Sequence, residues 1–204
     1  MTNSGSTNNA SLQRRDVVRA LLADRGDLLV IAGLGAPAWD ATDAGDDPLN
    51  FPLWGGMGGA VMIGLGLALA QPKRKVLVLT GDGEMLMGLG SLATVGVSQP
   101  KNLSVVVLDN EVYGETGMQR THTAYGVDLA ATARACGFAF SSTVTEDTEI
   151  APLRAAIHSG TGPLFVQIKV AAKQMPLVLP PRDGAHLKNR FREALLGQQA
   201  HSQN

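Results

Sequence analysis

Two short polar segments, each placed after a run of apolar residues, contain the side chains best suited to chemistry. Asp82 lies between two glycines directly after the apolar run 75–80, and Asn110 follows the next apolar run, 103–108. A glycine-flanked helix start favours a phosphate, because its free amides face an oxyanion that can approach closely. A carboxylate at that position would repel the phosphate unless a cation lay between them. Asp82 therefore indicates a bridging Mg²⁺, which prefers carboxylate, neutral and phosphate oxygens.

The spacing of these two residues leaves room for one helix and one strand between them. Asn110 follows Asp82 by 28 positions. If the two apolar runs are neighbouring strands of a parallel sheet, both side chains face one crevice beyond the strand ends. The Asn110 amide oxygen and the backbone carbonyl of Val112 would then be neutral metal ligands. The tripeptide Gly81–Gly83 alone is a weak signal, since a simple turn also explains it, so its context decides.

The elements that must position these loops alternate between strands and helices. Near-continuous Val, Leu and Ile in the strand segments specify a parallel sheet that is covered on both faces. We therefore expect an α/β fold with a doubly wound, mostly parallel sheet and helices on both faces. The expected strands are 28–32, 75–80, 103–108, 138–143 and 164–170, and the expected helices are 16–22, 58–70, 84–98, 128–136, 147–158 and 184–196.

Two segments of this pattern have a distinct character. Residues 35–54 contain three prolines and no periodicity, which predicts a loop that crosses the surface. Residues 58–70 are small and apolar throughout, which predicts a wholly buried helix, and this helix is too short to span a bilayer.

Size and composition limit the classes of protein that fit. The 204 residues suit a single domain at 13–200 after a flexible tail at 1–12. A net charge of −1, with no long apolar run, gives no reason to expect a nucleic-acid or membrane partner. The polar first dozen residues do not resemble a secretory signal, so we expect a cytoplasmic protein.

The motif around Asp82 and Asn110 resembles the thiamine diphosphate motif of the pyruvate-decarboxylase and acetolactate-synthase superfamily. By that resemblance Asp82, Asn110 and the Val112 carbonyl hold Mg²⁺, and the amides of Gly83 and Glu84 face the diphosphate of thiamine diphosphate. Gly81 belongs to the same cofactor-binding turn. Glu84 departs from the family, where a small residue is common, so its carboxylate must point away from the phosphate.

The segment Gly55-Gly56-Met57-Gly58-Gly59 resembles the part of this family that lies under the central kink of the cofactor. The resemblance implies that the Gly55 carbonyl accepts from the 4′-amino group and that the Met57 amide donates to N3′. The Met57 side chain would be the wedge that keeps the cofactor bent, with Gly56 beside it. Only a bent cofactor brings its 4′-imino group to the C2 proton. Ordinary core filling is the alternative for Met57.

The stretch from Tyr113 to Thr123, together with residues 99–103, resembles the sulfopyruvate and phosphonopyruvate decarboxylases, and this similarity covers about residues 28–170. Those relatives act on 2-oxo acids with a second anionic group, so a small 2-oxo acid is the implied substrate. The resemblance places Tyr113, Gly114 and Glu115 at the cofactor. Gln119 and His122 are the implied catalytic residues, although a loop histidine is more often structural. Thr116 and Arg120 are candidates for the substrate border, with a solvent-facing role as the alternative for Arg120.

The chemistry of this family also needs a glutamate on a separate pyrimidine-binding domain, for which 204 residues leave no room. We therefore expect a β-type subunit of a decarboxylase whose partner chain supplies that glutamate, in a hetero-oligomer built on a dimer. An acetolactate-synthase-like carboligase component and a non-catalytic cofactor-binding or regulatory module are the alternatives. The identity of the oxo acid, and the choice between decarboxylation and carboligation, stay open.

Two other enzyme classes share single features with this chain. Residues 33–38 match the dinucleotide pattern G-x-G-x-x-A, but the loop expected at 35–54 does not supply the helix and strand that a dehydrogenase needs. Ferredoxin-linked oxidoreductases use several cysteines for iron–sulfur clusters, whereas this chain has only Cys136. Both classes therefore fit less well than the decarboxylases.

Overall fold

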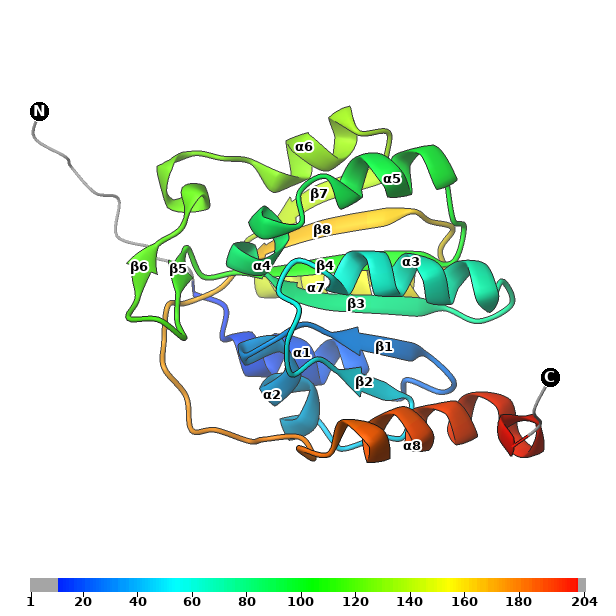
Figure 1. Cartoon of the computed structure of the whole chain (residues 1–204). Coiled ribbons are helices and arrows are strands. Elements are labelled where there is room, and N and C mark those ends of the chain that lie inside the picture. Colours follow the sequence, from blue (N-terminus) through cyan, green and yellow to red (C-terminus); the bar gives the residue numbers. More distant parts are fainter. Residues whose placement is uncertain (1–10, 202–204) are drawn as a thin grey trace, which may run out of the picture.

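The centre of the molecule is a sheet of six strands in the order β2-β1-β3-β4-β8-β7, and every neighbouring pair is parallel. We describe residues 11–201 of a computed structural model, shown in Figure 1. The expected α/β class and the parallel sheet are confirmed. The strands are β1 (Leu29–Ala32), β2 (Asn50–Pro52), β3 (Val76–Gly81), β4 (Leu103–Asp109), β7 (Phe140–Val144) and β8 (Leu164–Lys169).

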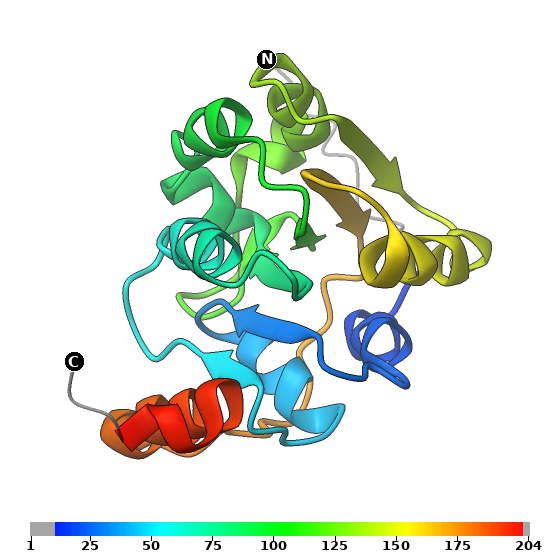
Figure 2. The same cartoon turned by 90° about the vertical axis from the view of Figure 1, so that its right-hand side faces the viewer.

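Helices cover both faces of this sheet, because successive strand residues point to opposite sides and both sets are apolar. In β3, for example, Leu77 and Leu79 join one core and Val76 and Val78 join the other. The first core is closed by α1 (Arg14–Leu22), α2 (Ala36–Asp43) and α7 (Ile150–Ser159). The second is closed by α3 (Ala60–Ala70), α4 (Asp82–Met87), α5 (Ser91–Ser98), α6 (Leu129–Ala135) and part of α8 (Gly184–Leu196). Figure 2 shows the sheet between the two helix layers.

Smaller elements complete the side where the strands end. A short antiparallel hairpin, β5 (Val112–Tyr113) and β6 (Gln119–Arg120), leads into the 3₁₀ helix η1 (His122–Tyr125). Two further 3₁₀ turns, η2 (Asp147–Glu149) and η3 (Gly197–His201), adjoin α7 and α8. The tail expected at 1–12 lies mostly outside the described residues, and its last residue, Leu12, is buried.

The loop predicted for residues 35–54 is wrong, because this segment contains both α2 and β2. Pro37 stands in the first turn of α2, where a proline lacks no needed amide and its fixed φ suits a helix. The helix and strand of a dinucleotide fold therefore do follow Gly33. The acidic residue that such a fold needs does not follow β2, where the chain continues Leu53-Trp54-Gly55.

The single helix predicted for 84–98 is divided into α4 and α5 by Gly88–Gly90. A Cβ on Gly88 would lie 2.2 Å from the carbonyl oxygen of Gly58, so the backbone passes directly against the start of α3. This contact explains the break, because a continuous helix with side chains could not come so close.

The prediction that the helix at 58–70 is wholly buried is also wrong. Met62, Ile63 and Leu69 of α3 are exposed, whereas Val61 and Leu65 belong to the core. An apolar outer face is typical of a surface that meets another protein.

Residues 170–183 connect β8 to α8 without regular structure, and we call them the strap. Figure 1 shows the strap in orange beyond the carboxyl ends of the strands. Two side chains bond to its backbone: Arg15 donates to the Pro176 carbonyl and Trp54 Nε1 donates to the Pro181 carbonyl at 2.8 Å.

Within residues 11–201, none of the helices combines the length and apolar character that crossing a membrane would take.

Two glycines of α3 provide a test of the packing between this helix and the sheet. A Cβ on Gly64 would lie 2.2 Å from Val78 Cγ2, whereas a Cβ on Gly66 would meet nothing within 4 Å. We expect Gly64→Ala to lower the free energy of unfolding by about 1–3 kcal/mol through overpacking. The same change at Gly66 should be neutral or stabilising by up to about 1 kcal/mol. Urea unfolding of both variants measures the difference, and equal effects would contradict this packing.

Candidate functional site

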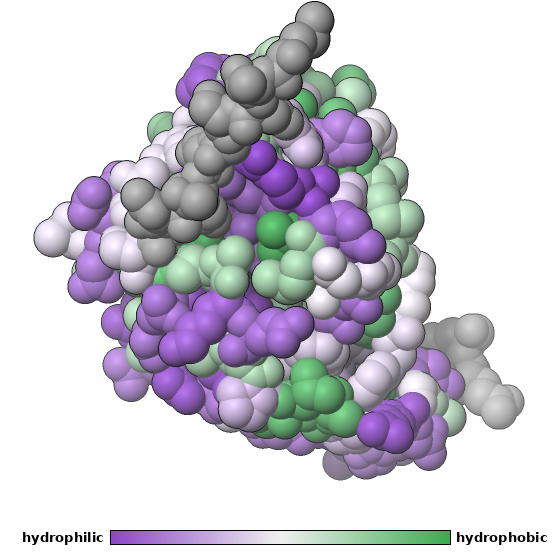
Figure 3. All heavy atoms as spheres, turned by 90° about the vertical axis from the view of Figure 1, so that its left-hand side faces the viewer, coloured by the Kyte–Doolittle hydropathy of each residue, from purple (hydrophilic) through white to green (hydrophobic). Residues whose placement is uncertain are grey.

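The ends of β3 and β4 are neighbours, as the spacing predicted. Gly81 pairs with Leu108 in the sheet register, so Asp82 and Asn110 follow adjacent strand ends. They open on a cavity of about 490 Å³ that lies beyond the carboxyl ends of the strands. The reversal of strand order occurs beside this cavity, because β2 lies on one side of β1 and β3 lies on the other. Figure 3 shows this face of the molecule, where polar and apolar residues lie close together.

Most of the predicted cofactor residues line this cavity. They are Met57, Gly81, Asp82, Gly83, Glu84, Asn110, Val112, Tyr113, Gly114 and Glu115, joined by Thr116. Gly55 and Gly56 are not among its lining residues. Met57, the turn 81–84 and residues of the segment 110–116 therefore meet at one cavity, although they are distant in the sequence. The individual roles assigned to these residues stay predictions.

The two glycines beside Asp82 differ in what surrounds them. A Cβ on Gly83 would lie 2.6 Å from the Tyr113 ring, so the close approach of this ring requires glycine. A Cβ on Gly81 would meet no protein atom within 4 Å, and Gly81 lines the cavity. The backbone at Gly81 is therefore open to a ligand rather than to another side chain.

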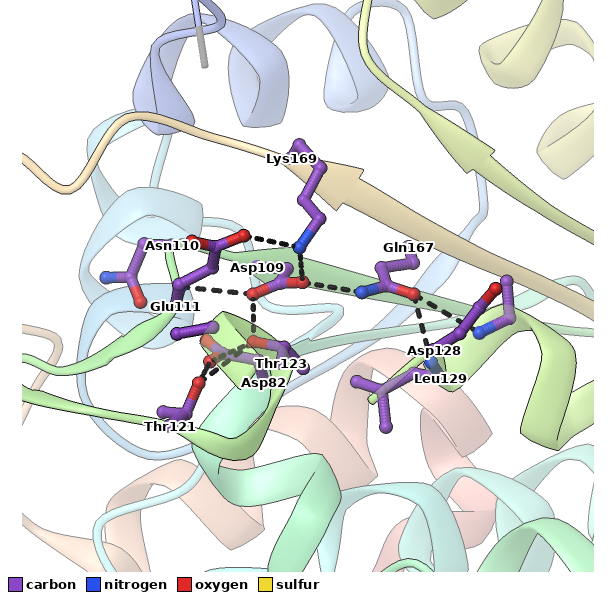
Figure 4. A network of polar contacts seen from close by, with 12 residues as sticks. Asp82, Asp109, Asn110, Glu111, Thr121, Thr123, Asp128, Leu129, Gln167 and Lys169 are labelled. Atoms are coloured by element: carbon purple, nitrogen blue, oxygen red, sulfur yellow. Dashed lines mark hydrogen bonds and ion pairs between the residues drawn. The ribbon is translucent and has the colours of Figure 1, made fainter. Parts of the chain in front are cut away.

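The carboxylate of Asp82 is buried and held by two threonines, as Figure 4 shows. Thr121 Oγ1 donates to Asp82 Oδ2 at 2.5 Å, and Thr123 Oγ1 lies 3.3 Å from the same oxygen. Both threonines follow β6, near the start of η1. The hairpin thus returns the chain to the first strand end and limits the rotation of this carboxylate. Neither threonine was identified as a site residue from the sequence.

A second carboxylate, Asp109 at the end of β4, lies fully buried in the same network. It accepts hydrogen bonds from Thr123 Oγ1 at 2.8 Å and from Gln167 Nε2 at 2.5 Å. It also forms an ion pair with Lys169 Nζ at 2.7 Å, and Lys169 reaches Glu111 at 2.8 Å. Asp109 therefore has a positive partner from β8 within the protein.

Gln167 extends this network to the beginning of α6. Its Oε1 accepts from the amides of Leu129 at 3.1 Å and Ala130 at 3.2 Å. These amides are first-turn groups that have no partner inside their own helix. The polar network from Asp82 to α6 thus connects groups of five elements around the strand ends, namely α4, η1, β4, β8 and α6.

Burial and neighbouring charges raise the pKa values of both Asp82 and Lys169, but they act together at Asp82 and oppose each other at Lys169. Burial, together with the nearby charge of Asp109, raises the pKa of Asp82 from 3.8 to about 7, although bonds from Thr121 and Thr123 oppose the shift. Burial alone would lower the pKa of Lys169, but Asp109 and Glu111 raise it overall. Asp82 without a cation therefore retains a proton at pH values where an ordinary aspartate is ionised.

Glu84 directs its carboxylate into the protein, as its departure from the family required. Oε2 accepts from Thr80 Oγ1 at 2.8 Å, and a Cβ on Gly33 would come within 1.8 Å of the same atom. Gly33 therefore has to be glycine for Glu84 to fit. Burial raises the pKa of Glu84, opposed by Thr80 and by the amides of Gly58, Ala60 and Leu34.

The cavity also has walls formed by residues outside the predicted cofactor motifs. The strap contributes Lys173, Gln174, Met175 and Leu177, and helices α1 and α2 contribute Arg14 and Trp39. Arg14 forms a buried ion pair with Asp40, which joins α1 to α2. These contacts bring together residues from both ends of the chain, so local sequence patterns contained no sign of them.

Three residues of the β5–β6 region lie apart from the cavity lining. Gln119 bonds to Thr116, with Nε2 donating to its carbonyl at 2.9 Å. Arg120 donates to the Ala124 carbonyl, and its guanidinium lies 4.7 Å from the centre of the Tyr125 ring. His122 is exposed at the start of η1. The catalytic roles predicted for Gln119 and His122 stay predictions.

The chemistry of the lining residues fits a magnesium diphosphate. One buried carboxylate, one amide oxygen and a nearby backbone carbonyl form the sparse oxygen set that Mg²⁺ accepts when phosphates complete its octahedron. The Asn110 Oδ1 accepts from the Val112 amide at 3.1 Å, and an amide oxygen is among the neutral ligands that Mg²⁺ accepts. The open backbone at Gly81 suits an approaching phosphate.

The raised pKa of Asp82 predicts how the stability of the metal-free chain depends on pH. Because the folded pKa lies near 7 and the ordinary value is 3.8, the folded chain keeps a proton that the unfolded chain loses. The stabilisation that this retained proton gives to the folded chain is complete below about pH 4, and it is lost as the pH rises through about 7. With a chelator present, Asp82→Asn should exceed the wild type in free energy of unfolding at pH 8, by more than about 1 kcal/mol. The difference should shrink at pH 5, and a constant difference would contradict the shift.

Comparisons with known proteins agree with this geometry. Residues 40–168 match the family model "Thiamine pyrophosphate enzyme, C-terminal TPP binding domain". The sulfopyruvate decarboxylase subunit beta of Methanocaldococcus jannaschii is 34% identical over 186 residues, which cover 90% of this chain and 97% of the relative. The phosphonopyruvate decarboxylase of Streptomyces viridochromogenes is 38% identical over 81% of this chain and 42% of the relative.

A solved structure supports the fold independently. The X-ray structure of a putative thiamin diphosphate-dependent enzyme from Mycobacterium smegmatis superposes with a TM-score of 0.67 and 19% identity. The match covers 85% of this chain, which spans about a third of the solved chain, 35% of its length. With both cavity and comparisons in agreement, the chain belongs to the thiamine pyrophosphate enzymes, as a thiamine pyrophosphate-binding domain related to the sulfopyruvate and phosphonopyruvate decarboxylases.

Proposed function

We propose that this chain is the β-type subunit of a thiamine diphosphate-dependent 2-oxo acid decarboxylase. The observation that carries the proposal is the pairing of Gly81 with Leu108, which presents Asp82 and Asn110 to one cavity. The length of the match to a subunit beta, 97% of that relative, supports a role as a separate subunit.

In this proposal the chain's own residues bind and orient the cofactor. Asp82, Asn110 and the Val112 carbonyl hold Mg²⁺, and the open backbone from Gly81 to Glu84 accepts the diphosphate. Met57 lines the cavity and is 38% exposed, so its side chain is available as the wedge beneath the cofactor. The bound cofactor supplies the electron sink for decarboxylation, and the protein supplies geometry and electrostatics.

The proposed substrate is a small 2-oxo acid with a second anionic group. The names of the relatives, sulfopyruvate and phosphonopyruvate decarboxylase, support this class. The cavity supports it through Lys173, which brings a positive side chain to the wall formed by the strap. A cation at that wall favours substrates with an additional negative charge.

A partner chain is part of the proposal, because a pyrimidine-binding domain has to supply the activating glutamate. Exposed apolar residues include Trp54, three positions before the cavity-lining Met57, and Met62, Ile63 and Leu69 of α3. Such residues are enriched where proteins associate. A hetero-oligomer built on a dimer would cover this surface and complete the site.

The central test of this function is the loss of metal-dependent cofactor binding in Asp82→Asn. The variant removes the single proposed charged ligand but keeps its size. Because outer partners of metal sites are worth about 10- to 100-fold in affinity, loss of a ligand itself should exceed that range. Calorimetric titration of thiamine diphosphate with Mg²⁺ measures the change, and the exposed Asp147→Asn in η2 is the control with the same charge change. Equal affinities in both variants would contradict the proposed site.

Activity is then measured after reconstitution with the partner chain. We expect CO2 release from 2-oxo acids with a sulfonate or phosphonate group, and none from the isolated chain. Decarboxylation alone leaves an aldehyde. A product in which the decarboxylated fragment is joined to a second carbonyl compound would instead favour the carboligase alternative. Cofactor binding without turnover by the reconstituted pair would favour a regulatory module.

A further inference from the structure

Asp109 and Lys169 lie beside the proposed metal site, yet neither is one of its proposed ligands. We propose that Thr123, Asp109 and Lys169 form a positioning unit that fixes the Asp82 carboxylate for the metal ion. This inference rests on the proposed function, because it concerns how the same site is held.

The geometry of Thr123 joins the two carboxylates. Its hydroxyl is 2.8 Å from Asp109 Oδ1, 2.9 Å from Thr121 Oγ1 and 3.3 Å from Asp82 Oδ2. A hydroxyl has one proton, and the shortest of these contacts is to Asp109. Thr123 therefore donates to Asp109, while Thr121 donates to Asp82. Asp109 thus sets the orientation of Thr123, whose oxygen packs against Thr121 Oγ1 and Asp82 Oδ2 and limits the rotation of the Asp82 carboxylate.

Asp109 is itself held by rigid neighbours. It lies opposite Lys169 in the pairing of β4 with β8, and Gln167 lies two residues earlier on β8. Its oxygens accept from Thr123, Gln167, Lys169 and the Glu111 amide, the last at 3.1 Å. Four donors offset the desolvation cost of this buried carboxylate and hold it in one orientation. The position of Asp109 in the sheet thus fixes Thr123, and Thr123 in turn restricts the proposed metal ligand Asp82.

Charge and position predict opposite effects for Lys169. If Lys169 acted only through its charge, its removal would strengthen Mg²⁺ binding, because a cation repels a dication. If Lys169 holds Asp109 in place, its removal weakens Mg²⁺ binding, because Asp109 loses a donor and can turn away from Thr123. The sign of the change therefore separates positioning from simple electrostatics.

The experiment is a calorimetric titration of Mg²⁺ into the purified chain with saturating thiamine diphosphate. Lys169→Met and Thr123→Val should each raise the Kd for Mg²⁺ about 10- to 100-fold. Because both residues act through one unit, combining Lys169→Met with Thr123→Val should raise the Kd for Mg²⁺ little more than either change alone. The exposed Lys188→Met in α8 removes the same charge elsewhere and should leave the Kd unchanged. Unchanged or tighter binding in Lys169→Met, or fully additive effects, would overturn the positioning unit.

A second variant covers the case in which Lys169→Met does not fold, since it leaves a buried charge without a partner. Adding Asp109→Asn to Lys169→Met removes that charge, so the combined variant should have a melting temperature close to that of the wild type. Its Mg²⁺ affinity should nevertheless stay weak, and wild-type affinity in this folded variant would overturn the proposal. Failure of the unmodified chain to bind Mg²⁺ would overturn the proposed function as well, whereas normal binding with unaffected variants would overturn this inference alone.

Discussion

The site depends on a difference between two buried aspartates that share one hydrogen-bond network. Asp109 has a positive partner inside the protein, because Lys169 lies opposite it on the neighbouring strand. Asp82 has two threonine hydroxyls, but within residues 11–201 no lysine or arginine forms an ion pair with it. A buried carboxylate without a cation is costly, and the raised pKa of Asp82 expresses that cost. A divalent ion at Asp82 would supply the missing charge.

The parallel sheet makes this difference possible. Strands β3, β4 and β8 end side by side, so three loops from separate parts of the sequence meet beyond one edge. The hairpin β5–β6 then returns Thr121 and Thr123 to the end of β3. Position and charge at the site are therefore properties of the sheet order, rather than of any single motif.

Much of this arrangement could be predicted from the sequence, because strand periodicity and the Gly-Asp-Gly turn are local signals. The buried strands and the adjacency of Asp82 and Asn110 followed from them. Helix α2 was missed because Pro37 reads as a loop signal when its place in a first turn is unknown. The break between α4 and α5 depends on the passage of Gly88 against Gly58, and the roles of Thr123, Asp109 and Lys169 depend on contacts between distant segments. Local patterns contain no information about such contacts.

The most direct measurement is a crystal structure of the chain with thiamine diphosphate and Mn²⁺ in place of Mg²⁺. Anomalous scattering would locate the metal ion without reference to any assumed ligand. We expect one ion in the cavity, bound by Asp82, Asn110 and the Val112 carbonyl together with diphosphate oxygens. An ion bound elsewhere, or Asp82 and Asn110 directed to separate cavities, would contradict it.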